Sequence, residues 1–369
     1  MDVMLILQGG GSLGAYECGV YRALAPWIKE KGHRLSVVAG TSIGAVNASV
    51  IASRYGDADH GVAALTGLWQ SLSEASALFL PPLGSLASVN AVWTSLLFGN
   101  PRMFQPIVPF WTLMPPVTWA PFAAFYDTTP IQETLSKYFN TLGPHHADPR
   151  LMLTAVDLRT DKVTTFDSVE TAITPRHVLA SCSLPPFFPA TELDGTSYWD
   201  GGLWSNTPIR EVLNALQNKP ESQGPAPLSE CLVVLVELFA PPNKDPGPIR
   251  ANWDVWARRD QIIFQNKGEY DSKAASAYNA HIDFVVEARR LLNFVPPSEQ
   301  VALKEVVACV DEELGKLKDS RRFRLNIQRI VHENDATGDV SREIDFSPQR
   351  IETLIKQGKD NARKRLMSF

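Results

Sequence analysis

The sequence predicts an α/β protein with a mostly parallel central sheet. In the first third of the 369-residue chain, short apolar runs alternate with segments whose apolar residues recur every three or four positions. Such runs are typical of strands and such segments of helices, and their alternation indicates a parallel sheet with helical crossovers. Residues 231–239 form the most apolar run of all, as expected of a strand buried on both faces.

The individual elements follow from the same patterns and from proline and capping residues at helix starts. The expected strands are at residues 4–7, 35–39, 151–157, 162–166, 231–239 and 323–327. The expected helices are at residues 13–31, 45–55, 129–139, 174–181, 208–216, 254–280 and 298–318, and from 347 onwards.

Composition divides the chain into three parts. Residues 1–240 carry most of the strand–helix alternation and are expected to form the main domain. Within them, residues 75–126 contain a single charged residue, Arg102, and many prolines, which predicts an apolar cap or lid insertion without a long helix. A proline-rich loop at 241–248 leads to residues 250–369, which we expect to be a mainly helical accessory region.

Charge, cysteine content and the absence of targeting signals exclude several classes of protein. The 35 Lys and Arg residues are outnumbered by 40 Asp and Glu residues, so nucleic-acid binding is not indicated. The four cysteines lack a CxxC pair, so neither a disulfide framework nor a metal site is expected. No signal peptide is evident, and prolines interrupt the apolar segment before the ~20 residues of a spanning helix. We expect a cytoplasmic protein, and nothing in the sequence indicates its oligomeric state.

The strongest chemical motif is Gly40-Thr41-Ser42-Ile43-Gly44, which lies between an expected strand and an expected helix. A serine on such a sharp turn is exposed as a nucleophile, and glycines at Gly40 and Gly44 let the backbone turn tightly. The helix that follows favours developing negative charge at its start. The motif therefore predicts that Ser42 is a catalytic nucleophile. Its structural alternative is a tight turn that packs a helix on a sheet.

A second motif, Gly9-Gly10-Gly11-Ser12-Leu13-Gly14, follows the first strand. Consecutive glycines free several backbone N–H groups to converge on one point, as an oxyanion hole requires. The spacing of Gly9, Gly11 and Gly14 also fits a dinucleotide fingerprint. That fingerprint needs an acidic residue after the second strand, where this chain has the serine motif instead. A third motif, Asp200-Gly201-Gly202, places a carboxylate in a loop, where it could equally cap a turn.

In this order, the three motifs resemble those of the patatin-like phospholipase family. Smaller segments, Ala155 to Leu158 and Ala180 to Pro189, are also similar to the family, and the likeness spans about residues 1–240. The C-terminal part, with Asp345-Phe346-Ser347-Pro348, looks like the accessory region of a bacterial patatin-like subgroup.

The resemblance implies a three-layer α/β/α fold and a lipid acyl hydrolase that needs no cofactor or metal. It implies that Ser42 is the nucleophile and Asp200 the general base, without a histidine. The amides of Gly9, Gly10 and Gly11 are implied to form the oxyanion hole, and an acyl-enzyme to form on Ser42. The implied motif-supporting residues are Gly14, Gly40, Gly44, Gly201 and Gly202.

Other readings of these motifs stay open. Some family members have a basic residue where this chain has Leu13, so neutral esters remain candidate substrates beside phospholipids. Asp157 is a rival carboxylate, although a role in a strand turn suits it better. A conventional triad would add His281 or His332, which follow Asp200 in the chain.

The apolar 75–126 segment indicates how the protein could contact a lipid substrate. Its aromatic residues could cover an acyl chain or touch a bilayer interface, or simply pack on the core. The sequence therefore predicts an acyl-ester substrate and peripheral membrane contact. Two other function classes remain, namely a non-catalytic acyl-ligand binding module and an acyltransferase. The aromatic residues in question are Trp93, Phe98, Phe104, Phe110, Trp111, Trp119, Phe122 and Phe125.

Overall fold

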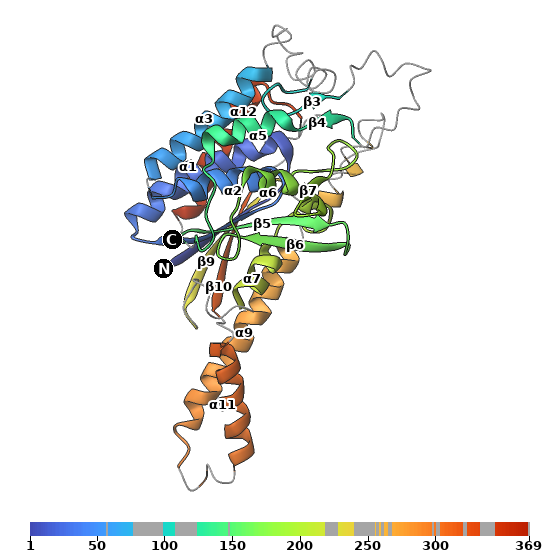
Figure 1. The fold of residues 1–369 in the computed structure, drawn as a ribbon. Helices are drawn as coiled ribbons and strands as arrows, with labels where there is room; N and C mark the ends of the chain where they lie inside the picture. Colours follow the sequence, from blue (N-terminus) through green and yellow to red (C-terminus); the bar gives the residue numbers. More distant parts are fainter. Residues whose placement is uncertain are drawn as a thin grey trace.

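The computed structural model shows a chain built around an eight-stranded mixed sheet (Figure 1). It describes residues 1–56, 58–76, 99–107, 124–146, 148–217, 228–239, 255, 258–259, 262–264, 268–296, 299, 303–319, 323–332 and 344–367. The strands of the sheet are β1 (Asp2–Leu7), β2 (Arg34–Gly40), β5 (Arg150–Asp157), β6 (Lys162–Asp167), β7 (Thr191–Leu193), β8 (Thr196–Asp200), β9 (Glu230–Glu237) and β10 (Arg324–Val331).

The sheet order is β10-β9-β1-β2-β5-β8-β7, with β6 paired to β5. The five strands from β10 to β5 run parallel, whereas β6, β7 and β8 pair antiparallel. The expected α/β class with a mostly parallel sheet is therefore confirmed. The described helices are α1 (Gly14–Glu30), α2 (Ile43–Ser53), α3 (Ala58–Ser76), α5 (Thr129–Tyr138), α6 (Pro175–Ser181), α7 (Ile209–Gln217), α9 (Gly268–Leu292), α11 (Lys304–Asp319) and α12 (Pro348–Leu366).

Helices cover both faces of the sheet, which gives three layers. Successive side chains of a strand point to opposite faces, so Leu5 packs in one core and Ile6 in the other. The larger core lies against α1, α2, α3 and α12, and the smaller one against α7 and α9. Because both faces are covered, β1 and β9 are apolar at nearly every position, as the sequence predicted for the latter.

The last described strand and helix are built into this same sheet and helix layer. β10 pairs in parallel with β9 along its whole length, and α12 packs along α1. The two helices approach closely at Gly19 and Gly358, where a Cβ atom on either residue would overlap the backbone of the opposite helix. The region expected as a helical accessory part thus supplies an edge strand and a core helix to residues 1–240.

Three features differ from the sequence expectations, and one is helix α3, whose residues 58–76 were not expected to form an element. The described residues of the helix expected over 254–280 are all helical, but α9 runs from Gly268 to Leu292 and so ends twelve residues later than expected. The β7–β8 hairpin was not expected, because its strands are only three and five residues long and only half-buried. Short strands of this kind carry too little apolar alternation to be recognised in a sequence.

A helical hairpin formed by α9 and α11 extends away from the sheet (Figure 1). Ile282 and Val285 of α9 pack against Leu317 of α11 in a small separate core. Arg289 and Asp311 form an ion pair between the two helices. None of the described helices is both long and apolar enough to cross a bilayer.

The apolar 75–126 segment is described only at its ends and around residues 99–107. Phe104 is buried and packs against Tyr126 and Phe188, so it belongs to the core. Phe125 lies beside a two-stranded pair, β3 (Gln105–Pro106) and β4 (Tyr126–Asp127), and is 52% exposed. The other aromatic residues proposed for a lid lie outside the described residues.

Candidate active site

Ser42 lies on a strained turn between β2 and α2. Its φ of 56° and ψ of −126° belong to a backbone region that residues other than glycine rarely occupy. The turn is tight enough that a Cβ atom on Gly40 would overlap the Gly44 carbonyl. The Ser42 N–H donates to the carbonyl and to the hydroxyl oxygen of Ser181, both at 3.1 Å. A strained serine held in this way is typical of a nucleophile.

Strand β5 brings the end of β2 and the end of β8 together. Gly40, the last residue of β2, pairs with Leu153, and Asp200, the last residue of β8, pairs with Ala155. β2 runs parallel to β5 and β8 antiparallel, so their carboxyl ends meet near Thr154. This arrangement places Ser42 beside Asp200.

Asp200 is buried, with 1% of its surface exposed, and accepts hydrogen bonds from the Ser42 hydroxyl and from the Gly202 N–H at 2.7 Å. Burial raises the pKa of Asp200 to about 7, although both hydrogen bonds act to lower it. A carboxyl group with a pKa near neutrality can both take and return a proton at physiological pH.

The glycine loop lies directly beside the Ser42 turn. Leu7 pairs with Gly40, and the loop continues from the end of β1 past the serine. At Gly9 a Cβ atom would lie 2.9 Å from the Ser42 Cβ, so only glycine fits there. Within the described residues, the N–H groups of Gly10 and Gly11 donate to no protein acceptor, whereas the Gly9 N–H points to the Asn206 carbonyl at 3.4 Å.

The side chain of Gln8 anchors the start of this loop. Its oxygen accepts hydrogen bonds from the N–H groups of Leu238, at 2.5 Å, and Phe239, at 3.2 Å. Its nitrogen donates to the Phe264 carbonyl at 3.2 Å and the Thr207 hydroxyl at 3.3 Å. The loop is therefore fixed by residues just beyond β9 and before α9.

The remaining motif glycines lie where backbones or side chains approach closely. Gly14 faces Ile43 and Trp69, Gly44 faces the Leu7 carbonyl, and Gly201 faces the Thr154 carbonyl. A Cβ atom on Gly202 would lie 3.1 Å from an oxygen of Asp200. These glycines hold the three motifs together without room for a side chain.

The rival acid and histidines have other partners. An oxygen of Asp157 accepts hydrogen bonds from the N–H groups of Arg159 and Thr160 in the turn after β5. His281 is half exposed on α9, 3.9 Å from Glu313. His332 is buried, and its ring packs edge-on against Tyr16. Among the described residues, the groups that act on the Asp200 pKa are Ser42 and Gly202 and include no histidine.

Three polar residues at the site were missed by the sequence analysis as functional candidates. Asn206, which follows the Asp200 motif, donates to the Gly9 carbonyl at 3.0 Å. Ser181 donates to the Thr154 carbonyl at 2.6 Å, and the Cys182 thiol donates to the Ser42 carbonyl at 3.2 Å. Ser181 and Cys182 lie in a segment similar to the patatin-like family, and Asn206 lies just beyond the Asp200 motif; the sequence held no other signal for them.

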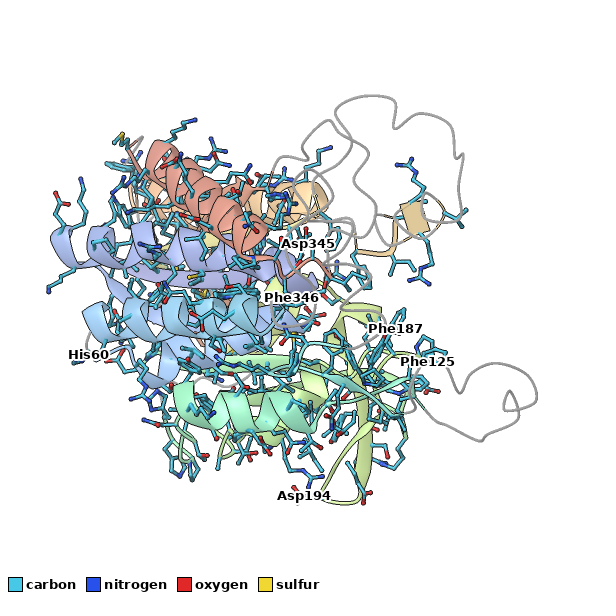
Figure 2. The ribbon with its side chains drawn as sticks, turned by 90° about the horizontal axis from the view of Figure 1, so that it is seen from above. His60, Phe125, Phe187, Asp194, Asp345 and Phe346 are labelled. Carbon is cyan, nitrogen blue, oxygen red and sulfur yellow. The ribbon has the colours of Figure 1, made fainter. Side chains whose placement is uncertain are left out.

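Exposed apolar side chains come from segments that adjoin the site. Leu203 and Trp204 follow the Asp200 motif, and Trp204 is 61% exposed. The Phe125 ring is tilted relative to that of Phe187, with ring centres 6.4 Å apart (Figure 2). We call this set the apolar rim. Its members are Ile107, Phe125, Leu203, Trp204, Ile262 and Ile263, each at least 41% exposed. Among the described residues, no group of three or more His, Cys, Asp or Glu side chains could hold a metal ion.

Comparison with known proteins found one matching family model and 14 matching chains of known structure, two of which are described below. A family model described as patatin-like phospholipase matches residues 5–213. The crystal structure of VipD from Legionella pneumophila is 14% identical, with a TM-score of 0.37, and the match covers 100% of this chain and 67% of that one. The type III effector protein ExoU is also 14% identical, with a TM-score of 0.32, and this chain spans about half of it, at 53%. No curated protein matches the chain in sequence.

Proposed function

Because the chain belongs to the patatin-like phospholipase family, a family of lipid acyl hydrolases, we propose that it cleaves acyl esters through a dyad of Ser42 and Asp200. One observation carries the proposal, namely that β5 aligns the ends of β2 and β8 so that Ser42, on a strained turn, lies beside the buried carboxyl group of Asp200. The ester specificity and the roles of single residues are our inference from this geometry.

In the first half of the reaction, the Ser42 oxygen attacks the ester carbonyl carbon and its proton passes to Asp200. The negative charge that develops on the carbonyl oxygen is bound by the N–H groups of Gly10 and Gly11. When the intermediate collapses, the bond to the leaving alcohol breaks and Asp200 returns the proton to that alcohol. The acyl group is then attached to Ser42.

In the second half, a water molecule takes the place of the alcohol. Asp200 accepts a proton from this water as its oxygen attacks the acyl carbon. The second tetrahedral intermediate collapses, the bond to Ser42 breaks, and the serine oxygen regains its proton from Asp200. The products are the free acid and the regenerated dyad, so protons balance over the cycle.

The test compares Ser42→Ala and Asp200→Asn with the unchanged protein on p-nitrophenyl esters and with a fluorophosphonate probe. We expect both variants to lose activity by at least about 10³-fold and Ser42→Ala to take up no probe. His281→Ala should stay active, since His281 lies on the α9–α11 hairpin. Full activity in folded Ser42→Ala would refute the proposal.

We also propose that the apolar rim contacts the surface of lipid aggregates, so that the protein is peripheral to membranes. Exposed Trp and aliphatic side chains beside an acyl site favour such contact, because burying them in lipid removes apolar area from water. Trp204→Ala should reduce hydrolysis of phosphatidylcholine vesicles about tenfold more than it reduces hydrolysis of a soluble short-chain ester.

The matched control for Trp204 is Phe284→Ala, because Phe284 is 70% exposed on α9 in the hairpin that extends from the sheet. Its loss should leave the ratio of vesicle to soluble activity unchanged. Equal effects of the two substitutions on this ratio would contradict contact through the rim.

For the division of the chain, we propose that residues 1–240 supply the reacting groups and that β10 and α12 complete the same catalytic unit. The support is the pairing of β10 with β9 and the packing of α12 on α1. In this division the α9–α11 hairpin is the accessory part.

A further inference from the structure

We propose that Asn206 is a positioning residue that orients the Gly10 N–H as an oxyanion donor. The inference rests on the proposed function, because it assigns a role to a residue that touches the glycine loop and not the reacting atoms. Asn206 lies six residues after Asp200, in the segment that leads to α7.

The Asn206 side chain fixes one particular peptide plane. Its Nδ2 donates to the Gly9 carbonyl at 3.0 Å. The Gly9 carbonyl and the Gly10 N–H belong to one planar trans peptide unit, in which they point in opposite directions. Holding the carbonyl therefore sets the direction of the N–H, and that N–H is one of the two donors left without a protein acceptor among the described residues.

A second hydrogen bond also joins Asn206 to Gly9. The Gly9 N–H points to the Asn206 main-chain carbonyl at 3.4 Å, so the two residues exchange hydrogen bonds. A Cβ atom on Gly9 would overlap the Asn206 Oδ1. The side-chain amide of Asn206 can therefore lie here only because residue 9 is a glycine. Without this contact, glycine peptides rotate more freely than any others.

The same side chain also lies close to the loop that carries the base. A Cβ atom on Gly202 would lie 3.1 Å from the Asn206 Oδ1 and equally far from an oxygen of Asp200. The Asn206 Nδ2 also points to the Phe264 carbonyl at 3.4 Å. Asn206 thus sets the glycine loop relative to the Asp200 loop, which relates the oxyanion donors to the general base.

Kinetic measurements can distinguish this positioning role of Asn206 from a contribution to the stability of the fold. A misoriented Gly10 N–H weakens binding of the tetrahedral intermediate and leaves ground-state substrate binding largely intact, so kcat falls while KM does not change. Asp at this position has nearly the same volume but offers no N–H, and its carboxylate would face the Gly9 carbonyl. Asn206→Asp should therefore be at least as impaired as Asn206→Ala.

A matched control exists at Asn279, on α9. Its Nδ2 donates to the Leu325 carbonyl at 2.8 Å and its Oδ1 accepts the Leu325 N–H at 2.9 Å. Like Asn206, it is half-buried and exchanges two hydrogen bonds with the backbone of one residue. Asn279→Ala therefore removes a similar contact at a place where no reacting group lies.

The experiment measures kcat, KM and the pH midpoint on a soluble p-nitrophenyl ester, the rate of fluorophosphonate labelling, and the melting temperature. We expect Asn206→Ala to lower kcat and the labelling rate about 10- to 100-fold, with KM within about threefold and the pH midpoint unchanged. Asn279→Ala should lower the melting temperature and leave kcat within about threefold.

Three results would overturn the inference. The first is that folded Asn206→Ala has a kcat and a fluorophosphonate labelling rate within threefold of those of the unchanged protein. Another is a loss of the same size in Asn279→Ala, and the third is a loss confined to KM. If Asn206→Ala does not fold, the near-isosteric Asn206→Asp decides by the same criteria. Failure of the proposed function itself would appear separately, as activity that survives Ser42→Ala.

Discussion

At the scale of single residues, the burial of Asp200 has opposite effects on chemistry and on stability. Burial raises the pKa of Asp200 to about 7, against the hydrogen bonds from Ser42 and Gly202. The ionised carboxylate is the form that can accept the Ser42 proton. We therefore expect kcat/KM to rise tenfold per pH unit below about pH 7 and to level off above it. The measurement is a pH profile between pH 5 and 9 on an uncharged ester.

The stability of the fold should change in the opposite direction. The folded pKa of Asp200, about 7, exceeds the ordinary unfolded value of ~3.9, so the folded state binds the proton more tightly. The contribution of Asp200 to the free energy of unfolding therefore falls as pH rises from about 4 to 7, by up to about 4 kcal/mol. Relative to the unchanged protein, inactive Asp200→Asn should gain melting temperature at pH 8 and not at pH 4.5. An equal difference at both pH values would contradict the raised pKa.

At the scale of elements, the contact between α1 and α12 depends on two glycines. A Cβ atom on Gly358 would overlap the Tyr16 carbonyl, and both partners are helix backbone that cannot move aside. Gly358→Ala should therefore destabilise the protein by about 1–3 kcal/mol or more, although alanine is the better helix former. Chemical denaturation measures this change.

The control for this prediction is a glycine in a helix without a close neighbour. Gly315 lies inside α11, and no heavy atom other than those of its chain neighbours and its own helix backbone lies within 4 Å of the position where its Cβ would be. Gly315→Ala should be neutral or should stabilise the fold by up to about 1 kcal/mol. Destabilisation of similar size in both variants would show that packing against α1 is not the cause.

At the scale of the whole molecule, the C-terminal strand and helix determine where the chain can be cut. A chain ending at residue 250 would lack β10 and α12, leaving β9 as an open edge and the apolar side of α1 exposed. We expect this truncated chain to be insoluble or unfolded. Soluble, active protein ending at residue 250 would show that residues 1–240 fold independently.

Shortening the hairpin provides the comparison. Replacing residues 285–316 by a short Gly/Ser linker removes most of α9–α11 but keeps the strand and helix that follow. Because the hairpin has its own small core around Ile282 and Leu317, we expect a folded protein that retains hydrolysis of soluble esters. Circular dichroism and ester hydrolysis distinguish the two shortened chains.

The sequence predicted local structure and the identity of the candidate reacting groups better than it predicted how they meet. The strand before Ser42 and the helix after it have strong local patterns, and β2 and α2 lie close to the expected bounds. The alignment of β2 and β8 end to end along β5 has no such signal, because it depends on pairing between distant segments.

The same reasoning explains the two larger gaps in the sequence analysis. Alternation at Phe323, Leu325 and Ile327 predicted a strand, yet nothing local shows that it joins β9. Asn206 was visible only as a neighbour of the Asp200 motif. Its hydrogen bonds to Gly9 join residues 197 positions apart, and such contacts are set by the folded topology.

The order of the strands also has a consequence for synthesis of the protein on the ribosome. β1 and the glycine loop are made well before β9, which borders β1 and begins at Glu230, and Phe264 follows still later. Until these segments emerge, Gln8 lacks three of its four hydrogen-bond partners and β1 has one open edge. Under the proposed mechanism, the nascent chain carries Ser42 long before the oxyanion donors are ordered, so it should not cleave esters until residues as far as Phe264 have been made.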